Sequence, residues 1–376
     1  MLGISAFSGR LHRHFPIFIE ATRDLFHGVN PYGKAYDHTG MQSYYHYAPF
    51  STFVFRPFLS LPLSWAYFGY MGMSLALFFT GLTRLANFLL PANARGTLSI
   101  FYLILASEVI GSTFGAKIEV ITCGVLFWSL FLLLRGEHVV TSGFLMTVAS
   151  LWKLQPLPIL GLVFLAIVFS RDWKTLKGIT TGAALGTAIS VLTPYLFFPA
   201  AYTTELYRAW LSVLDSTWKQ MWRTYQSLFT LSFQLFGWPN DAAQVQVLGL
   251  LTPLFFIALL WLARSRGRNR NILLAFALGS AFIPVFSPMS QGMAYILGAG
   301  MLLACSLERL SEKPYFRRPI WTAALLFHWY FTSLNFSDVV PEPMRISHLT
   351  VRPIGFCVLT ILVVISYRRS ALSARI

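Results

Sequence analysis

A series of long apolar runs, separated by short polar turns, constrains this chain more than any other feature of its sequence. Runs of about 15–22 residues can cross a bilayer as helices, which satisfy their own backbone hydrogen bonds there. The pattern therefore predicts a bundle of about eleven membrane helices. The spans lie near residues 63–83, 97–113, 119–134, 139–152, 156–170, 176–196, 244–263, 271–286, 292–306, 320–336 and 351–367.

The composition agrees with this interpretation. Of 376 residues, 56% are hydrophobic and only 11% are charged, which is too apolar for a soluble protein of this length. We predict an all-α polytopic membrane protein. A first outer loop at 1–62 and a second at 197–243 separate membrane helices at 63–196 from membrane helices and a tail at 244–376.

The basic residues predict the orientation of the helices. If loops alternate between the two sides, one set carries 17 Lys and Arg against 4 Asp and Glu, and the other side has 12 against 10. Loops rich in Lys and Arg stay in the cytoplasm. Both long loops then face outward, the C-terminus is cytoplasmic, and the expected location is the bacterial inner membrane. The net charge of +15 becomes a topology signal, so a nucleic-acid partner is not expected.

This orientation places the N-terminus outside with no span before it. The opening "MLGISAFSGRLHRHF" lacks the apolar region of a signal peptide. Either the chain inserts with its N-terminus outside, or a first helix precedes Met1, and we favour the second.

A lysine interrupts the apolar sequence in "SLWKLQPLPIL", residues 150–160. Lys153 lies 18 residues from both Arg135 and Arg171, so each flanking helix spans only about 27 Å. We therefore expect a turn recessed below the outer surface, at the wall of an outward-open cavity. Lys153 either extends to the interface or holds a phosphate in a semi-dry site, where its charge acts most strongly.

Few other ionisable groups lie near this cavity. Glu108 falls inside the second span, and Lys117 and Glu119 flank the outer end of the next helix. Glu108 is either functional or a buried acid satisfied by a neighbour such as Lys153. Lys117 and Glu119 either line the cavity or form an ordinary interfacial pair.

The first outer loop combines a predicted amphipathic helix at 16–26 with an aromatic stretch, "YYHYAPF" at 44–50. Such rings form a belt at the membrane interface or stack on a sugar. The sequence has no phosphate-binding glycine loop and no HExxH. Its three cysteines lie in separate apolar segments, and His12 and His14 lack a third ligand, so neither a metal nor another cofactor is predicted.

Several stretches together resemble glycosyltransferase family 87. The members of this family are GT-C membrane enzymes that use polyprenol-phosphate-mannose. The similarity runs from about Phe15 to Arg318. The stretches are "FPIFIEATRDLFHGVNPYG", "YHYAPFSTFVFRPFLSLP", "WKLQPLPILGLVFLAIVFSRDWK", "TYQSLFTLSFQLFG" and "FSPMSQG".

The resemblance implies that the chain transfers a hexose, expected to be mannose, from a polyprenyl-phosphate donor to a hydroxyl of a lipid or glycan at the outer face of the bilayer. It also implies roles for individual residues. Donor-binding residues would be Lys153, Gln155, Gln226, Ser227, Ser287 and Ser290. We expect Tyr47, Pro49, Lys117, Glu119 and Gln291 to line the cavity, and Lys117 and Glu119 depart from the family, where relatives often have Gln and Asn.

The sequence departs from the family pattern at the expected catalytic acid. Relatives usually place an Asp just before the aromatic residue that is Phe15 here, and this chain has His14. The base is then His14, Asp37 or Glu108, or activity has been lost. Two alternatives stay open: a flippase or transporter of a lipid-linked sugar, and an inactive membrane scaffold. A transporter often shows an inverted repeat, and the two long loops here are unlike each other.

Overall fold

The computed structural model describes most of the chain, and this part is almost entirely helical. Described are residues 15–37, 42–90, 102, 105, 109, 117–221, 228–238, 241–265, 267–286, 296–310, 318–333 and 342–373. Within these ranges there are fourteen α-helices and one two-stranded sheet. The all-α class predicted from the sequence is confirmed.

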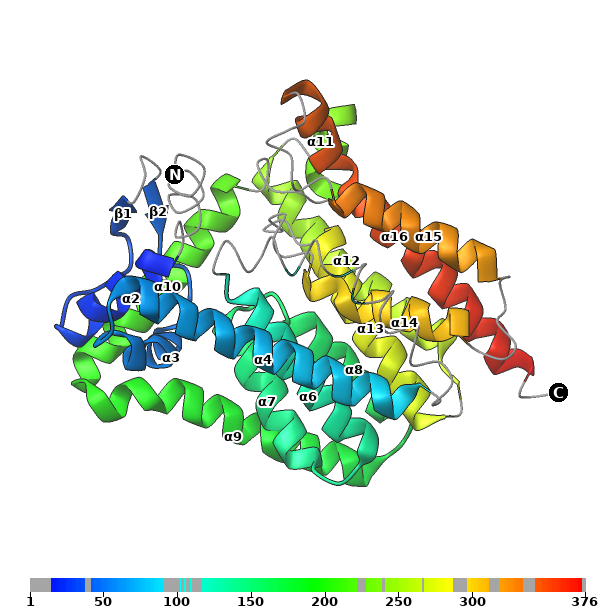
Figure 1. Cartoon of the computed structure of the whole chain (residues 1–376), viewed down its shortest axis with the longest axis horizontal. Coiled ribbons are helices and arrows are strands. Elements are labelled where there is room, and N and C mark those ends of the chain that lie inside the picture. The colour runs from blue at the N-terminus through cyan, green and yellow to red at the C-terminus, as the bar shows by residue number, and fades with distance from the viewer. Residues whose placement is uncertain are drawn as a thin grey trace.

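A small aromatic unit, residues 15–58, lies at one end of the molecule (Figure 1). We call it the N-terminal unit. Its elements are α2 (Phe15–Phe26), the antiparallel strands β1 (Ala35–Asp37) and β2 (Gln42–Tyr44), η1 (Pro49–Ser51), α3 (Thr52–Phe55) and η2 (Arg56–Phe58). The helix predicted at 16–26 is therefore present, whereas the hairpin was not predicted.

The aromatic residues of the N-terminal unit form a core. The side chains of Phe15, Phe18, Tyr45 and Phe55 are buried. The rings of Phe18 and Phe55 stack with centroids 4.6 Å apart, and Phe15 also contacts the ring of Tyr70 on the next helix. The rings of Phe15 and Phe55 thus attach this unit to the bundle through Tyr70, and Tyr45, one of the rings that suggested an interfacial belt, is buried in the unit.

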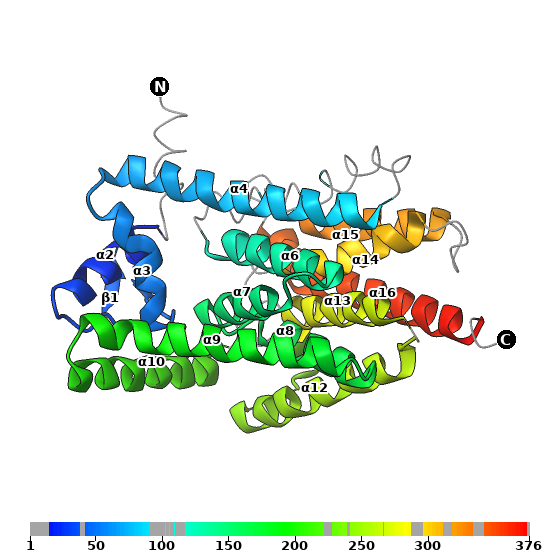
Figure 2. The ribbon, with the colours of Figure 1, turned by 90° about the horizontal axis from the view of Figure 1, so that it is seen from below.

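Five helices of the described part of the chain form the first half of the bundle; Figures 1 and 2 show how they are arranged. These are α4 (Leu63–Leu89), α6 (Glu119–Arg135), α7 (Val139–Trp152), α8 (Leu157–Phe169) and α9 (Trp173–Phe197). Helix α4 packs on α6, α6 on α7, and α7 on α9.

Glycines permit the closest of these helix contacts. A Cβ atom added to Gly182 of α9 would lie 2.0 Å from the carbonyl oxygen of Val140 on α7. A Cβ added to Gly143 of α7 would lie 2.3 Å from the carbonyl oxygen of Ile179. Small residues let helix backbones approach closely in membranes, where lipid tails weaken the hydrophobic drive for helices to associate.

The second half of the chain completes the bundle. It comprises α10 (Ala200–Met221), α11 (Leu228–Phe236), α12 (Ala242–Ala263), α13 (Arg268–Phe286), α14 (Ala299–Leu310), α15 (Arg318–Ser333) and α16 (Glu342–Ser373). Helix α13 packs against α8, joining the two halves. Helix α10 contacts η1, so the described part of the second polar loop is largely helical and lies beside the N-terminal unit.

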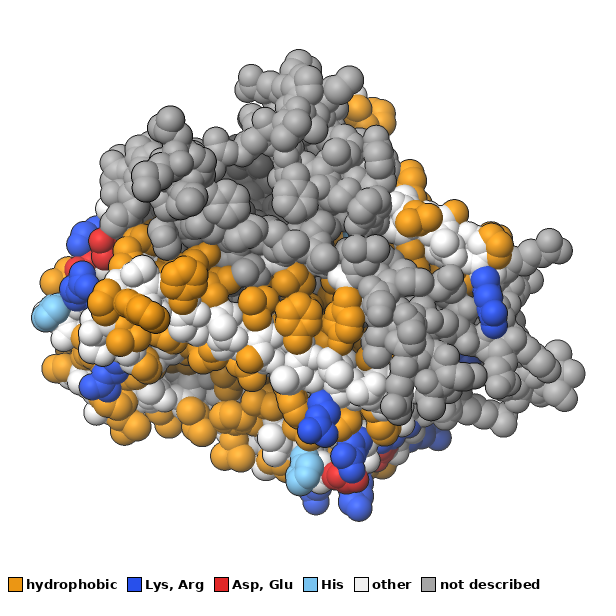
Figure 3. All heavy atoms as spheres, viewed as in Figure 1, with side chains coloured by type: hydrophobic (Ala, Val, Ile, Leu, Met, Phe, Trp, Pro, Cys, Tyr) orange, Lys and Arg blue, Asp and Glu red, His pale blue; other side chains and the backbone are white. Residues whose placement is uncertain are grey.

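Three helices among the described residues are long and apolar enough to cross a bilayer. They cover Leu63–Leu89, Trp173–Phe197 and Gln246–Ala263. Large apolar side chains are exposed along them, including Leu192 and Leu196 of α9 and Leu250 of α12. Figure 3 shows such a surface, broad and apolar, on one face. Surfaces of this kind suit contact with lipid. The count of eleven spans stays a prediction.

The end of the bundle opposite the N-terminal unit is basic, and we call it the basic end. Arg268, at the start of α13, pairs with Asp172 (Nε–Oδ2, 2.8 Å) and donates to the carbonyl oxygen of Leu133 (3.0 Å). Gly136 ends α6 in the left-handed conformation (φ 74°). A cation at the carbonyl end of a helix is stabilised by its dipole. Arg268 thus links the start of α13 to the ends of α6 and α8, where the loops are predicted to be cytoplasmic.

Candidate active site

The candidate site is built around the turn between α7 and α8, and the chain forms this turn where the sequence predicted it. Helix α7 ends at Trp152, and Lys153 has an extended backbone (φ −144°, ψ 118°). A residue before proline avoids the helical conformation, so Gln155 and Pro156 separate the two helices before α8 begins at Leu157.

The helices on either side of this turn are short. Helices α7 and α8 have 14 and 13 residues, which corresponds to lengths of about 20 Å, whereas the 27 residues of α4 reach about 40 Å. The two helices that meet at this turn are therefore about half as long as α4. Trp152 is buried, and the Lys153 side chain is only 20% exposed.

Lys153 forms an ion pair with Glu119, the first residue of α6. The ammonium donates a hydrogen bond to Oε1 of a carboxylate whose side chain is fully buried. A buried charge requires such a partner, and the start of a helix also favours an acid. The second oxygen, Oε2, is buried and has no hydrogen-bond partner among the described residues.

Lys117 adds a second cation to the site. Its side chain is 6% exposed, and its backbone carbonyl accepts a hydrogen bond from the hydroxyl of Tyr70 (3.3 Å). Burial lowers the pKa of Lys117 to about 8; Glu119 partly opposes this shift, and Lys153 adds to it. The cluster therefore places two lysines beside one carboxylate.

The N-terminal unit covers this cluster with Tyr47 and His46. The ammonium of Lys153 lies 5.8 Å from the centroid of the Tyr47 ring, within the range of a cation–π contact. The backbone carbonyl of Tyr47 accepts from the Tyr32 hydroxyl (2.7 Å). The backbone carbonyl of His46 accepts from Nε1 of Trp210 on α10 (3.0 Å). Segments far apart in sequence thus meet at Lys153.

His46 contributes a neutral imidazole to the neighbourhood. Burial, together with the positive charges of Lys153 and Lys117, lowers its pKa from 6.5 to about 4. The ring therefore stays uncharged at physiological pH and adds no third cation to the cluster.

The structure brings together part of the predicted set of residues. Lys153, Glu119, Lys117 and Tyr47 lie around one point, with Gln155 and Pro49 close to them in the chain. Asp37 closes β1, opposite Gln42, and its side chain is not described. The other predicted residues lie outside the described part of the chain: His14, Glu108, Gln226, Ser227, Ser287, Ser290 and Gln291.

Two residues of this region were missed by sequence reasoning. His46 stands inside the quoted stretch "YYHYAPF", where only the aromatic rings were considered. Trp210 lies in the second long loop, and only the helical fold of that loop shows that it reaches His46. Within the described ranges, no group of three or more His, Cys, Asp or Glu residues could hold a metal ion.

A comparison with known families decides the class of protein to which this site belongs. Residues 45–288 match glycosyltransferase family 87. The chain belongs to this family. The matched region begins just before His46 and includes Tyr47, Lys117, Glu119 and Lys153.

The suspected relationship to family 87 is thereby confirmed, and the chain is a glycosyltransferase with membrane helices. No curated protein and no solved structure gives a significant match. The family match leaves α2 outside its limits, as well as α14, α15 and α16. It covers every described residue of the cluster around Lys153.

Proposed function

We propose that this family 87 enzyme transfers a hexose, mannose, from a polyprenyl-phosphate donor to an acceptor hydroxyl on a lipid or glycan. The reaction takes place at the outer face of a bacterial inner membrane, with the C-terminus in the cytoplasm. The observation that carries the proposal is the Lys153 cluster, in which two lysines lie near one buried carboxylate at the turn between α7 and α8.

The charge of this cluster suits the phosphate of the donor. Its two cations exceed its one anion, and neither Lys117 nor Glu119 is open to solvent. Two unit charges 4 Å apart attract by about 4 kcal/mol at an effective dielectric constant of 20. Glu119 holds Lys153 in place before the donor arrives, and the donor phosphate then provides a second anion for the same ammonium group.

The remaining groups recognise the sugar. Glu119 Oε2, which has no partner within the described ranges, accepts a hydrogen bond from a sugar hydroxyl. Gln155, Gln226, Ser227, Ser287 and Ser290 contact sugar or phosphate. Tyr47 offers its ring to the apolar face of the hexose, and Pro49 and Gln291 line the cavity beside it.

The reaction is a direct displacement at the anomeric carbon. The acceptor oxygen forms a bond to C1 while the bond from C1 to the phosphate oxygen breaks, so the configuration inverts. Negative charge grows on the departing polyprenyl phosphate, and Lys153 stabilises it there. A base takes the proton of the acceptor hydroxyl. His14, Asp37 and Glu108 are the candidates for this base.

A transfer assay with the purified full chain in proteoliposomes tests the proposal. Labelled polyprenyl-phosphate mannose is supplied with a membrane extract as the source of acceptor, and a nucleotide-linked mannose serves as the control donor. We expect label on the acceptor from the lipid donor alone. Transfer from the nucleotide donor alone would contradict the proposed donor, and movement of the lipid across the bilayer without bond exchange would indicate a flippase.

A further inference from the structure

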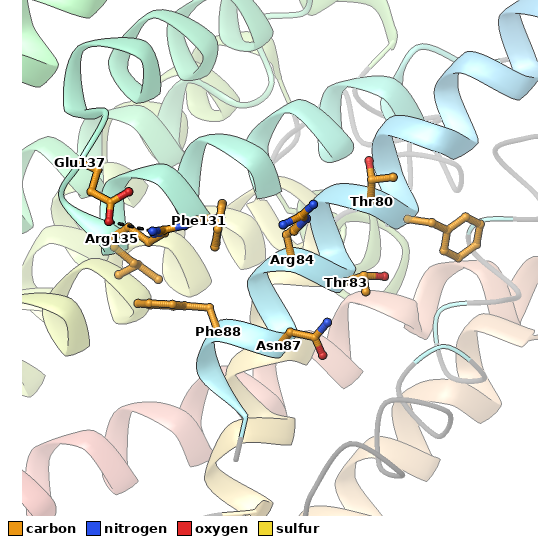
Figure 4. A pocket seen from close by; sticks show the side chains of 10 residues that line it. Thr80, Thr83, Arg84, Asn87, Phe88, Phe131, Arg135 and Glu137 are labelled. Atoms are coloured by element: carbon orange, nitrogen blue, oxygen red, sulfur yellow. Dashed lines mark hydrogen bonds and ion pairs between the residues drawn. The ribbon is translucent and has the colours of Figure 1, made fainter. Parts of the chain in front are cut away.

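A second charged site lies at the basic end of the molecule, in a groove between α4 and α6 (Figure 4). The groove has a volume of about 800 Å³. It is separated from the Lys153 cluster by the whole of α6, because Glu119 begins that helix and Arg135 ends it. We call it the Arg84 groove. Its lining is Phe79, Thr80, Thr83, Arg84, Asn87, Phe88, Phe131, Leu134, Arg135 and Glu137.

Two arginines from different helices border this groove. Arg84 of α4 is exposed and has no ion-pair partner among the described residues. Arg135 of α6 pairs with Glu137 (2.7 Å) and lies over the ring of Phe131 at 5.5 Å. Because Glu137 offsets only one of the two guanidinium groups, the groove keeps an excess of positive charge.

The rest of the lining is amphipathic. The rings of Phe79 and Phe88 are 41% and 44% exposed, although both lie on a helix long and apolar enough to cross a membrane. Asn87 adds an amide beside Arg84, while Thr80 already accepts a hydrogen bond from Nε1 of Trp128 (3.2 Å). Cationic, amide and aromatic groups thus share one groove.

We infer that the Arg84 groove binds the headgroup of an anionic phospholipid such as phosphatidylglycerol. Its phosphate lies between Arg84 and Arg135, a headgroup hydroxyl bonds to Asn87, and the acyl chains follow Phe79 and Phe88. A lipid is the source of the phosphate because the groove opens beside the lipid-facing surface of α4 and is lined by aromatic rings. Basic pockets between membrane helices bind anionic lipid headgroups in this way.

The test compares thermal unfolding of the full chain in detergent with added phosphatidylglycerol, phosphatidylcholine or inorganic phosphate. Arg84→Gln is the test variant. Arg23→Gln is the matched control, because Arg23 is also exposed but lies at the end of α2 in the N-terminal unit. Native mass spectrometry counts the lipid bound to each protein.

We expect phosphatidylglycerol to raise the unfolding temperature of the wild type and of Arg23→Gln more than phosphatidylcholine does. Arg84→Gln should bind phosphatidylglycerol roughly fivefold more weakly, since one basic residue near an anionic lipid surface contributes about that factor. An undiminished phosphatidylglycerol effect in Arg84→Gln would overturn the site. An equal effect from inorganic phosphate would overturn the assignment to a lipid.

Discussion

At the scale of single residues, the most informative feature is that the lysine of the α7–α8 turn is already paired. Extension to the interface alone does not explain Lys153, because its ammonium contacts a carboxylate with no solvent exposure. Nor is Glu119 simply the interfacial partner of Lys117, since it bonds to a residue 34 positions away in sequence. A buried pair is weak support for stability by itself. Its position inside the family match points to function instead.

The Lys153–Glu119 contact is tested by a double-mutant cycle. Glu119→Gln leaves Lys117 and Lys153 facing each other without an anion, and Lys153→Gln leaves a buried carboxylate with one fewer cation. Each single change should lower the free energy of unfolding, and the double change should lower it by less than their sum. We expect a coupling energy of about 1–3 kcal/mol, measured by thermal or denaturant unfolding in detergent. Additive effects would mean that the two side chains do not interact.

The pH dependence of donor capture follows from Lys117. Burial lowers its pKa to about 8, so the free enzyme loses one cation as the pH rises through that value. We expect kcat/KM for the donor to fall above about pH 8, since this ratio reports groups of the free enzyme. Lys117→Arg should remove this decline because a guanidinium stays protonated.

His46 supports a second prediction, which concerns the pH dependence of kcat/KM at acidic pH. Its pKa is lowered to about 4, so it stays neutral from pH 5 to 8. No step in kcat/KM near pH 6.5 should therefore arise from it, and His46→Gln should leave the shape of the profile between pH 5 and 7 unchanged. If kcat/KM of the wild type changes near pH 6.5 and this change disappears in His46→Gln, the result would contradict the buried, neutral state of this ring.

At the scale of elements, glycine contacts set how closely α7 and α9 pack. Gly182→Ala places a methyl group against the carbonyl of Val140, whereas Gly161→Ala on α8 has nothing within 4 Å of the new Cβ atom. We expect Gly182→Ala to cost about 1–3 kcal/mol of unfolding free energy. Gly161→Ala should be neutral or stabilising by up to about 1 kcal/mol. Equal unfolding temperatures for the two variants would contradict the close packing.

The sequence alone predicted the positions of helices better than the side-chain contacts between them. The helices at 139–152 and 156–170 were expected almost to the residue, because Lys153, Gln155 and Pro156 interrupt an otherwise continuous apolar run. Local pattern could not show that Glu119 turns toward Lys153, since that contact depends on how α6 packs beside α7. The hairpin of β1 and β2 was missed because each strand has only three residues, too few to show an alternating apolar pattern.

The candidate site was predictable only in part for a similar reason. Lys117, Glu119 and Lys153 stood out as rare charges in apolar sequence, and the structure gathers them. Trp210 and His46 carried no comparable signal, because their proximity depends on α10 folding back onto the N-terminal unit. The base stays a prediction: His14 and Glu108 lie outside the described residues, as does the side chain of Asp37.

At the scale of the whole molecule, the bundle separates its two ends chemically. One end carries the N-terminal unit and the turn of Lys153, and the other carries the loops joined by Arg268 (Figures 1 and 2). This separation agrees with the charge count that predicts a cytoplasmic basic end.

The orientation can be measured with single cysteines in intact cells. Lys34→Cys lies on the N-terminal unit and Gly267→Cys in the loop before α13, and both positions are exposed. A membrane-impermeant maleimide should label Lys34→Cys in intact cells and Gly267→Cys only after permeabilisation. The native Cys123 and Cys305 are buried but Cys357 is partly exposed, so Cys357→Ser is introduced first and that chain supplies the background. The reverse labelling pattern would invert the proposed topology.

The most direct test of the central claim is the rate of sugar transfer from polyprenyl-phosphate mannose by three variants of the full chain. In Lys153→Ala, kcat should fall by a factor of about 10²–10³, which is the usual effect of removing one group that stabilises developing negative charge. Lys153→Arg should keep part of the activity. Lys34→Ala, which removes an exposed lysine paired with Asp24, should match the wild type. Wild-type transfer by Lys153→Ala would contradict the role of this lysine at the donor phosphate.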